Sequence, residues 1–169
     1  MPDQSLTKRE FASVFREMLK TEPFRKISVG DLCEKCGLNR KSFYYHFKDK
    51  YDLVNWIFYT EFVSLLGGRD YENGWDLMDG LCAYFYENRD FYRKVLSVDG
   101  QNSFREYFKE ILEPLVRDYL QDIVGDRARA DFFVDFYAEA IVSAVVRWLT
   151  DKKVMTAGEF MALTRECVS

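Results

Sequence analysis

Apolar residues recur at spacings of three and four along almost the whole of this chain of 169 residues. The first such segment spans residues 7–21, where Phe11, Val14, Phe15 and Met18 keep this spacing. That period brings side chains to one face of a helix, whereas a half-buried strand would need strict alternation. The sequence contains no alternating run, internal repeat or low-complexity segment, and it therefore predicts an all-α protein.

Two short helices are expected directly after the first one. Ser28 precedes VGDLCEKC and Asp31 follows three residues later, which is the capping-box pattern of a helix start. Gly37 provides the stop, because glycine readily takes the left-handed conformation that often follows a helix. Asn39 is a good N-cap for the next helix, RKSFYYHF. Two short helices joined by such a turn predict a helix-turn-helix.

The chain is expected to divide into two helical domains. Residues 1–50 contain the three helices just described, and residues 51–169 form a second, helical bundle domain. Asp49 caps a fourth helix that runs from Lys50 to about Leu66 and is shared by both domains. A turn-rich stretch follows at 67–74. The remaining helices are predicted at about 75–86, 91–96, 103–122, 128–150 and 157–168.

The net charge of −4 conceals an asymmetry between the two parts. Residues 1–50 contain 11 Lys or Arg against 7 Asp or Glu, whereas residues 51–169 contain 13 against 21. The first domain can therefore attract a polyanion that the second would repel, although a basic excess alone could also be a solvated face. The sequence shows no signal peptide and no apolar run long enough for a membrane span, so we expect a soluble, cytoplasmic protein.

The third helix has the most unusual composition. Phe43 and Phe47 lie four residues apart on one face, which should pack against the first two helices. The opposite side would suit the major groove of DNA, where cations meet phosphates and Arg or Lys can donate to guanine. The hydroxyl of Ser28 and the helix start there can bond to phosphate oxygens. The side chains that point away are those of Arg40, Lys41, Ser42, Tyr44, Tyr45 and His46. Alternatively, Tyr44 is a packing residue and His46 only holds the following turn.

The stretch ISVGDLCEKCGLNRKSFYYHFKDKYDL resembles the DNA-binding region of TetR-type transcriptional regulators. The match runs over residues 11–58 and includes the Gly37-Leu38 turn and the aromatic cluster that ends in Phe47. One position departs from the pattern, because Gly30 stands where some members carry a base-reading side chain. The resemblance implies base contacts from Arg40, Lys41 and Ser42, and phosphate contacts from Tyr44, Tyr45, His46 and Lys50.

The helix at 128–150 is apolar over most of its circumference, so two different surfaces must cover it. One cover is its own chain and the other is expected to be a second copy, which makes a homodimer that reads two half-sites. The last helix would pair with this one, as the resemblance also implies. The alternative is a central helix in a monomeric bundle. The expected interface residues are Phe132, Phe136, Ala140, Ala144, Trp148, Phe160 and Leu163.

The resemblance also implies how such a protein is controlled. In the family, a small molecule commonly binds the second, regulatory and dimerisation domain and releases the DNA. We therefore expect a repressor that binds a palindromic operator as a homodimer and is released by an effector. The compact size of the chain and the passage YYHFKDKYDLVNWIF, residues 44–58, also look similar to the dihydroxyacetone kinase regulator subgroup. That resemblance makes control by a partner protein, without a small-molecule pocket, the alternative.

Cys33 and Cys36 form a C-x-x-C pair, which raises thiol redox sensing as a further alternative. Zinc is not expected, because Cys82, Cys167 and His46 are the remaining nitrogen or sulfur candidates and none is paired at short spacing. Both cysteines are instead expected to act as small apolar residues. The sequence has one histidine and no nucleophile or phosphate-loop motif, so we predict no enzyme, no metal and no cofactor.

Overall fold

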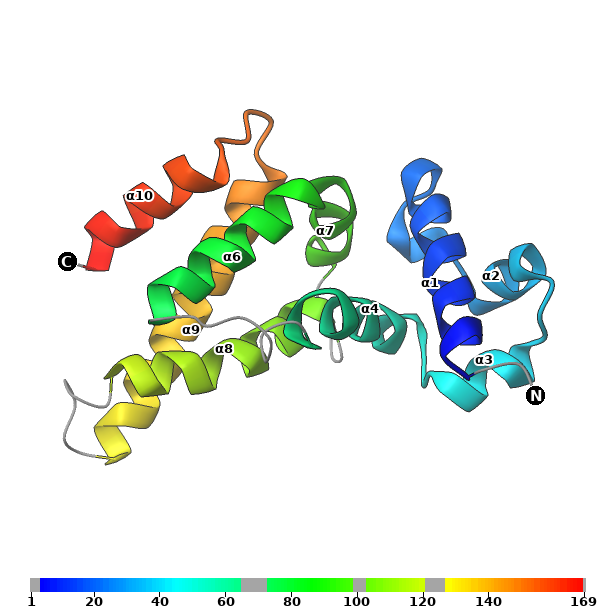
Figure 1. Ribbon diagram of the computed structural model, residues 1–169, viewed down its shortest axis with the longest axis horizontal. Coiled ribbons are helices and arrows are strands. Elements are labelled where there is room, and N and C mark those ends of the chain that lie inside the picture. Colours follow the sequence, from blue (N-terminus) through cyan, green and yellow to red (C-terminus); the bar gives the residue numbers. More distant parts are fainter. Residues whose placement is uncertain (1–3, 65–72, 99–102, 121–126, 169) are drawn as a thin grey trace.

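The computed structural model describes residues 4–64, 73–98, 103–120 and 127–168, and every regular element in these ranges is helical. The prediction of an all-α protein is confirmed. Figure 1 shows a small N-terminal group of helices joined through α4 to a larger bundle. The first group consists of α1 (Gln4–Thr21), the short 3-10 turn η1 (Phe24–Lys26), α2 (Val29–Cys36), α3 (Arg40–His46) and α4 (Lys50–Phe58). The bundle contains η2 (Tyr59–Val63), α6 (Gly74–Glu87), α7 (Arg89–Leu96), α8 (Phe104–Leu120), α9 (Arg127–Thr150) and α10 (Ala157–Val168).

The caps predicted for α2, for the start of α3 and for the start of α4 are confirmed, whereas α1 begins at Gln4, earlier than the predicted residue 7. The side chain of Ser28 accepts from the amide of Asp31, and the Asp31 carboxylate accepts from the amide of Ser28, which completes a capping box. Gly37 ends α2 in the left-handed conformation with φ 65° and ψ 24°. Asn39 and Asp49 cap α3 and α4 through their side-chain oxygens. These caps satisfy amide groups that a helix start leaves without an intrahelical partner.

Five phenylalanines pack α1 against α3, against the residue that follows α3, and against η1. Phe11 of α1 meets Phe43 of α3 edge to face with the ring centroids 5.2 Å apart, and Phe47 packs against both rings. Phe15 contacts the ring of Phe24 in η1 in the same edge-to-face manner. All five rings are buried, and the spacing of Phe43 and Phe47 predicts this for the last two. The opposite side of α3 is consequently turned outward.

The fourth helix belongs to both parts of the molecule, because it packs against α1 and also against α8. The sequence predicts one helix to about residue 66, but α4 ends at Phe58 and continues as the π-helix η2. A π-turn accommodates an extra residue per turn and so changes the direction of the side chains that follow. Residues 65 and 66, and most of the turn-rich stretch at 67–74, lie outside the described residues.

The centre of the second domain is filled by aromatic rings. Phe58 stacks on Phe85 with a centroid distance of 5.7 Å and meets Phe104 edge to face at 5.1 Å. Phe85 in turn contacts Tyr92 at 4.8 Å and Phe108 at 5.1 Å. All five of these side chains are buried. Because Phe58 comes from α4, the core of the second domain is directly attached to the helix that also touches α1.

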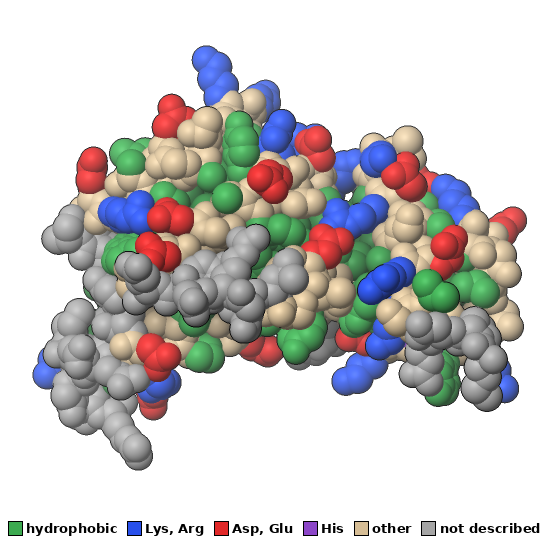
Figure 2. All heavy atoms as spheres, in the orientation of Figure 1, with side chains coloured by type: hydrophobic (Ala, Val, Ile, Leu, Met, Phe, Trp, Pro, Cys, Tyr) green, Lys and Arg blue, Asp and Glu red, His purple; other side chains and the backbone are tan. Residues whose placement is uncertain are grey.

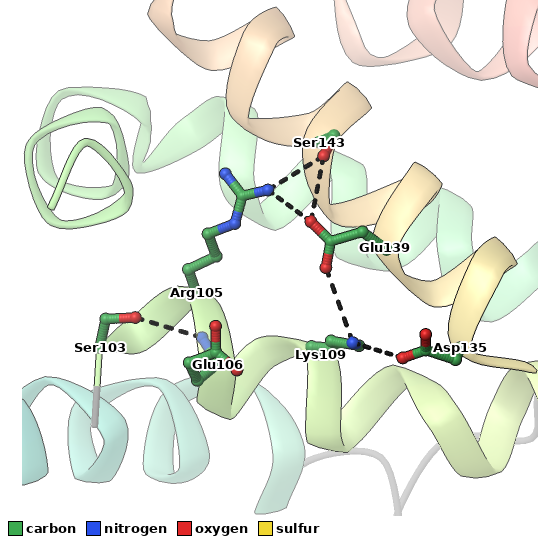
Figure 3. A network of polar contacts seen from close by, with 7 residues as sticks. All are labelled: Ser103, Arg105, Glu106, Lys109, Asp135, Glu139 and Ser143. Carbon is green, nitrogen blue, oxygen red and sulfur yellow. Dashed lines mark hydrogen bonds and ion pairs between the residues drawn. The ribbon is translucent and has the colours of Figure 1, made fainter. Parts of the chain in front are cut away.

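Helices α8 and α9 lie against each other and are tied by the polar network in Figure 3. Arg105 donates to Glu139 at 2.6 Å and to Ser143 at 3.0 Å. Lys109 donates to Asp135 at 2.6 Å and lies 3.7 Å from the other oxygen of Glu139. The α9 members of the network, Asp135, Glu139 and Ser143, follow one another at a spacing of four and so form a polar row along the helix. Asp135, Glu139 and Ser143 of α9 are therefore paired with α8 while remaining exposed.

The last helix packs along α6 instead of running along α9, which corrects the expected pairing. Arg165 forms an ion pair with Asp79 of α6 at 2.5 Å and lies over the Trp75 ring. Contact with α9 is made at its C-terminal end, through Trp148. Within the described ranges, no helix has the length and apolar character that crossing a membrane would require.

Candidate nucleic-acid interface

Helix α3 is positioned by contacts at both of its ends. At its start, Asn39 accepts a hydrogen bond of 2.8 Å from the amide of Ser42. The turn before it is closed by the amide of Leu38, which donates to the carbonyl of Cys33 at 3.0 Å. The buried Phe43 and Phe47 fix its rotation about its own axis. These contacts determine which side chains of α3 face outward.

The outward side of α3 is the aromatic and basic surface that the sequence singles out. Tyr44 is 56% exposed and Tyr45 is 71% exposed, which is high for aromatic side chains. Arg40 and Lys41 are also exposed, whereas Ser42 and His46 are half-buried. Stable folds rarely leave adjacent aromatic rings in water without a function for them. We define the recognition surface as Arg40, Lys41, Ser42, Tyr44, Tyr45 and His46.

His46 lies at the edge of this surface. Its ring is 5.0 Å from that of Tyr45, centroid to centroid, in an edge-to-face arrangement. Partial burial lowers the pKa of His46, and the ammonium group of Lys8 lowers it further. The imidazole is therefore neutral near pH 7 and can donate one hydrogen bond without carrying a charge. Lys8 itself is a residue that the sequence reasoning missed, because it comes from α1, far from α3 in the chain.

Charge around the N-terminal domain is mixed in sign. Figure 2 shows Lys and Arg side chains extending from this part of the molecule, with acidic side chains between them. The basic excess of residues 1–50 is therefore not gathered into one continuous patch on the face shown. Binding to a duplex would depend on where individual cations stand on α3 more than on the summed charge of the domain.

Two of the expected phosphate contacts have other partners. The hydroxyl of Ser28 donates to the Asp31 carboxylate at 2.5 Å, and the amide of Ser28 donates to the same oxygen at 3.1 Å. Both donors of Ser28 are thus used inside the capping box. The expectation that Ser28 donates to a phosphate is corrected accordingly, since a capping serine has no second proton to give.

Lys50 is the second correction. Its ammonium group donates to the backbone carbonyls of Phe24 and Ile27, each at 2.7 Å, and lies 4.5 Å from the centroid of the Phe24 ring. Burial lowers the pKa of Lys50, while Asp49 opposes that shift. Lys50 therefore holds the turn around η1 in place. No sequence pattern predicts this contact, because the turn is formed by residues more than twenty positions away.

A chain of polar contacts connects α1 to the centre of the second domain. Arg16 forms an ion pair with Glu61 of η2, and the guanidinium also lies 4.3 Å from the ring centroid of Phe91. Glu61 accepts a second hydrogen bond, of 2.8 Å, from the hydroxyl of Tyr84. The Tyr84 oxygen is 2.7 Å from that of the buried Tyr92. We call Arg16, Glu61, Tyr84 and Tyr92 the interdomain relay.

Lys94 makes a second connection between the domains. Its ammonium group, on α7, donates to the carbonyl of Leu19 and, at 3.2 Å, to that of Lys20. These carbonyls are at the C-terminal end of α1, where the helix has no further amide to satisfy them. A cation at this end also interacts favourably with the helix dipole. The orientation of α1 is consequently linked to α7.

The exposed face of α9 contains four of the residues expected at a dimer interface. Phe132 is 67% exposed and Phe136 is 56% exposed, and their rings stack with centroids 6.3 Å apart. Ala140 and Ala144 continue this row along α9 and are exposed. Leu163 of α10 is exposed as well. We define the α9 apolar row as Phe132, Phe136, Ala140 and Ala144.

Trp148 and Phe160 do not belong to an exposed face. Their rings stack on each other with centroids 4.4 Å apart, and the Tyr86 ring lies 6.2 Å from that of Trp148. The indole nitrogen donates to the carbonyl of Met155 at 2.8 Å. Both side chains are buried within the chain, so their assignment to the dimer interface is corrected. They instead join α9 to α10.

The cysteines of the C-x-x-C pair lie on α2 as free thiols. Burial raises the pKa of Cys33, and it raises the pKa of Cys36 to about 11. Thiols with raised pKa values carry little thiolate at neutral pH and react slowly with oxidants. In the described part of the chain, no three His, Cys, Asp or Glu side chains are grouped as metal ligands would be. Cys33 is packed in the core, as the sequence predicts for a small apolar residue.

The fold and the outward side of α3 define a helix-turn-helix protein with a helical C-terminal domain. Residues 15–57 match the family model described as "Bacterial regulatory proteins, tetR family", and residues 73–168 match "Transcriptional regulator C-terminal region". The second match alone covers more than half of the chain. The chain belongs to the TetR family of transcriptional regulators.

Individual relatives agree with this assignment. The chain is 26% identical over 155 residues to the HTH-type dhaKLM operon transcriptional activator DhaS of Lactococcus lactis subsp. lactis (strain IL1403), which covers 87% of this chain and 81% of the relative. A structure of a dihydroxyacetone kinase operon activator DhaS matches with a TM-score of 0.65 and 22% identity, covering 96% of this chain and 92% of the other. A TetR transcriptional regulator from Streptococcus agalactiae 2603V matches with a TM-score of 0.75 and 23% identity, covering 98% and 95%. These structures share the fold.

Proposed function

We propose that this regulator binds a palindromic DNA operator as a homodimer in the cytoplasm, with α3 of each copy in the major groove. The observation that carries the proposal is the division of α3 into two sides. Phe43 and Phe47 are buried, while Arg40, Lys41 and the two adjacent tyrosines face outward. A helix of this kind can enter the major groove and place its N-terminal side chains against base edges.

The residue roles follow from position on α3. Arg40, Lys41 and Ser42 are at the start of the helix and would meet base edges. Tyr44, Tyr45 and His46 would bond to phosphates and fix the register of the protein on the duplex. Ser28 and Lys50 are no longer included, because their donors are used inside the protein.

The α9 apolar row supports the homodimer. Two stacked and exposed phenylalanines lose contact with water when a second copy covers them. The small side chains of Ala140 and Ala144 allow two helices to approach closely. Two copies arranged in this way would present their α3 helices to half-sites about 34–36 Å apart.

The control signal is proposed to arrive through a partner protein that contacts the second domain. Supporting this choice, the five rings of Phe58, Phe85, Tyr92, Phe104 and Phe108 are buried and contact one another, as rings that fill a core do. The relative from L. lactis is named as an activator, so we propose activation in place of the repressor expected from the sequence. Release by a small-molecule effector is the competing outcome.

The test is selection of duplexes from a random pool with the full chain, followed by binding at fixed salt. We expect a palindrome to be enriched and bound at least ~1,000-fold more tightly than random sequence, as specific sites are. The Arg40→Ala and Lys41→Ala variants should relax the preference at single base pairs. Equal weakening on all duplexes would show that these side chains contact phosphates only. A reporter driven by the selected site then gives the sign of regulation.

A further inference from the structure

Arg40 and Gly30 meet across the helix-turn-helix. Gly30 is the second residue of α2 and Arg40 is the first residue of α3. A Cβ atom on residue 30 would lie 2.5 Å from an Nη atom of Arg40, 3.3 Å from its Cζ and 3.4 Å from its Nε. The guanidinium group therefore occupies the volume that any other side chain at position 30 would need.

The backbone does not explain the presence of glycine here. Glycine is among the weakest helix formers, and it is needed only where φ is positive or where another group must come close. Gly37 is in the positive-φ conformation, whereas Gly30 is a regular helical residue. What glycine provides at position 30 is space for the guanidinium group.

One nearby carboxylate attracts the guanidinium group toward this place. The N-terminal end of α2 repels a cation through its helix dipole. Asp31, the next residue, offsets this repulsion. Its pKa is lowered mainly by the hydrogen bonds with Ser28, and further by the nearby charges of Lys35 and Arg40, so the carboxylate is ionised. Its attraction to Arg40 favours the position over Gly30.

We propose that Gly30 is a positioning residue for base recognition, and that it seats the Arg40 guanidinium between α2 and α3 so that one base of the operator is read. The inference rests on the proposed function, because it assigns a specificity determinant within that recognition surface. Arginine reads guanine through two parallel hydrogen bonds, and such a pair requires a fixed direction of approach. A side chain at position 30 would displace the Arg40 guanidinium group from this direction of approach, while Arg40 would keep its positive charge.

The direct test is the Gly30→Ala variant. Non-bonded carbon and nitrogen atoms settle about 3.5 Å apart, so the guanidinium must move by about 1 Å. The end of a long side chain can move this far at little cost, and alanine favours the helix, so the variant should fold at least as stably. Its affinity for the selected duplex should fall by roughly 5- to 150-fold, which is what a bidentate contact contributes. Affinity for random duplexes should change less than about 2-fold.

The matched control is Gly158→Ala. Gly158 is also the second residue of its helix, α10, and a Cβ atom there would have nothing within 4 Å. This variant shares the change in helix propensity but displaces no arginine. It should bind the selected duplex like the unmodified protein.

A double-mutant cycle identifies the mechanism. In an Arg40→Ala background, Gly30→Ala should cause no further loss on the selected duplex, because the group it displaces is gone. Arg40→Lys keeps the charge but lacks the planar fork, and it should lose the preference at the same base pair while binding random duplexes normally. This variant leaves position 30 unchanged, so it tests the base contact even if Gly30→Ala folds poorly.

The possible results distinguish failure of the proposed role of Gly30 from failure of the proposed DNA-binding function. Independent losses that add in the double variant, or an unchanged preference in Gly30→Ala or Arg40→Lys, would overturn the inference and leave the proposed function intact. If the unmodified chain selects no duplex, the proposed function is overturned and this inference with it.

Discussion

The hydroxyl oxygens of Tyr84 and Tyr92 are 2.7 Å apart, which makes the buried Tyr92 the inner end of the interdomain relay. Burial raises the pKa of both tyrosines, so each keeps its proton over the whole physiological range. Tyr84 also donates to Glu61, and Glu61 is paired with Arg16 of α1. A shift of η2 would therefore be felt by α1 on one side and by the aromatic core on the other.

We predict that Tyr92→Phe lowers the free energy of unfolding by about 1 kcal/mol, because it leaves a part-buried hydroxyl of Tyr84 with one partner fewer. Urea denaturation of the full chain measures this change. Tyr59→Phe is the matched control, since Tyr59, at the start of η2, is half exposed. Its hydroxyl group is hydrogen-bonded to water, so removing that hydroxyl costs little stability. Equal stability of the two variants would mean that the Tyr84–Tyr92 contact contributes nothing.

The corrected role of Lys50 gives a second prediction. Lys50→Ala leaves the carbonyls of Phe24 and Ile27 without their side-chain donor, and it should cost about 1–3 kcal/mol of stability. The dependence of DNA affinity on salt should keep its slope, because no phosphate contact is lost. Lys48→Ala is the control, since Lys48 is an exposed lysine two residues earlier, in the loop between α3 and α4. A stable Lys50→Ala protein with a slope shallower by about one unit would restore the phosphate contact.

Local chemistry explains what the sequence predicted well. The ends of α2 and α3 are set by Ser28, Gly37 and Asn39, each of which acts on amides within three residues of itself. The two sides of α3 follow from the spacing of Phe43 and Phe47. Such features require no knowledge of distant segments, so periodicity and capping rules are sufficient to predict them.

Apart from Ser28, whose donors bond to Asp31 three residues away, the parts that were missed depend on residues far apart in the chain. Lys50 stands at a helix start, which suggests a phosphate, yet its partners are in η1, a turn that no sequence pattern marked. Trp148 looked like an interface residue because α9 is apolar on several faces, and only the position of α10 shows that it is covered by Phe160. The relay likewise joins Arg16 to a carboxylate 45 positions later. Sequence spacing carries no signal for such pairs.

His46 predicts a pH dependence that can be isolated, because it is the one histidine in the chain. Its pKa in the folded protein is lower than the ordinary value of 6.5, through burial first and Lys8 second. Between these two pKa values the unfolded chain binds more protons than the folded one, so stability rises with pH. The contribution of the neutral His46 to the free energy of unfolding is complete above pH 6.5. It is lost as the pH falls toward the pKa of His46 in the folded protein.

The measurement compares unfolding of the unmodified chain and His46→Gln between pH 7.5 and pH 5.5. Carboxylates titrate alike in both proteins, so the difference between the two curves reports the histidine alone. We expect the unmodified chain to lose stability relative to His46→Gln as the pH is lowered. A relative gain would show that His46 is held in its protonated form, and the assigned direction would then be wrong.

The α9 apolar row makes the homodimer testable without DNA. Phe136→Glu places a carboxylate at the middle of the proposed contact, where a second copy would have to remove it from water. Loss of a central aromatic contact costs about 2 kcal/mol or more, which corresponds to a dissociation constant at least ~30-fold higher. Sedimentation at several concentrations should show a monomer under conditions where the unmodified chain is a dimer. Tyr59→Glu, another exposed aromatic side chain but on η2, should leave the dimer unchanged. A dimer that survives Phe136→Glu and Phe132→Glu would require a different surface, and α10, with the exposed Leu163, would be the next to change.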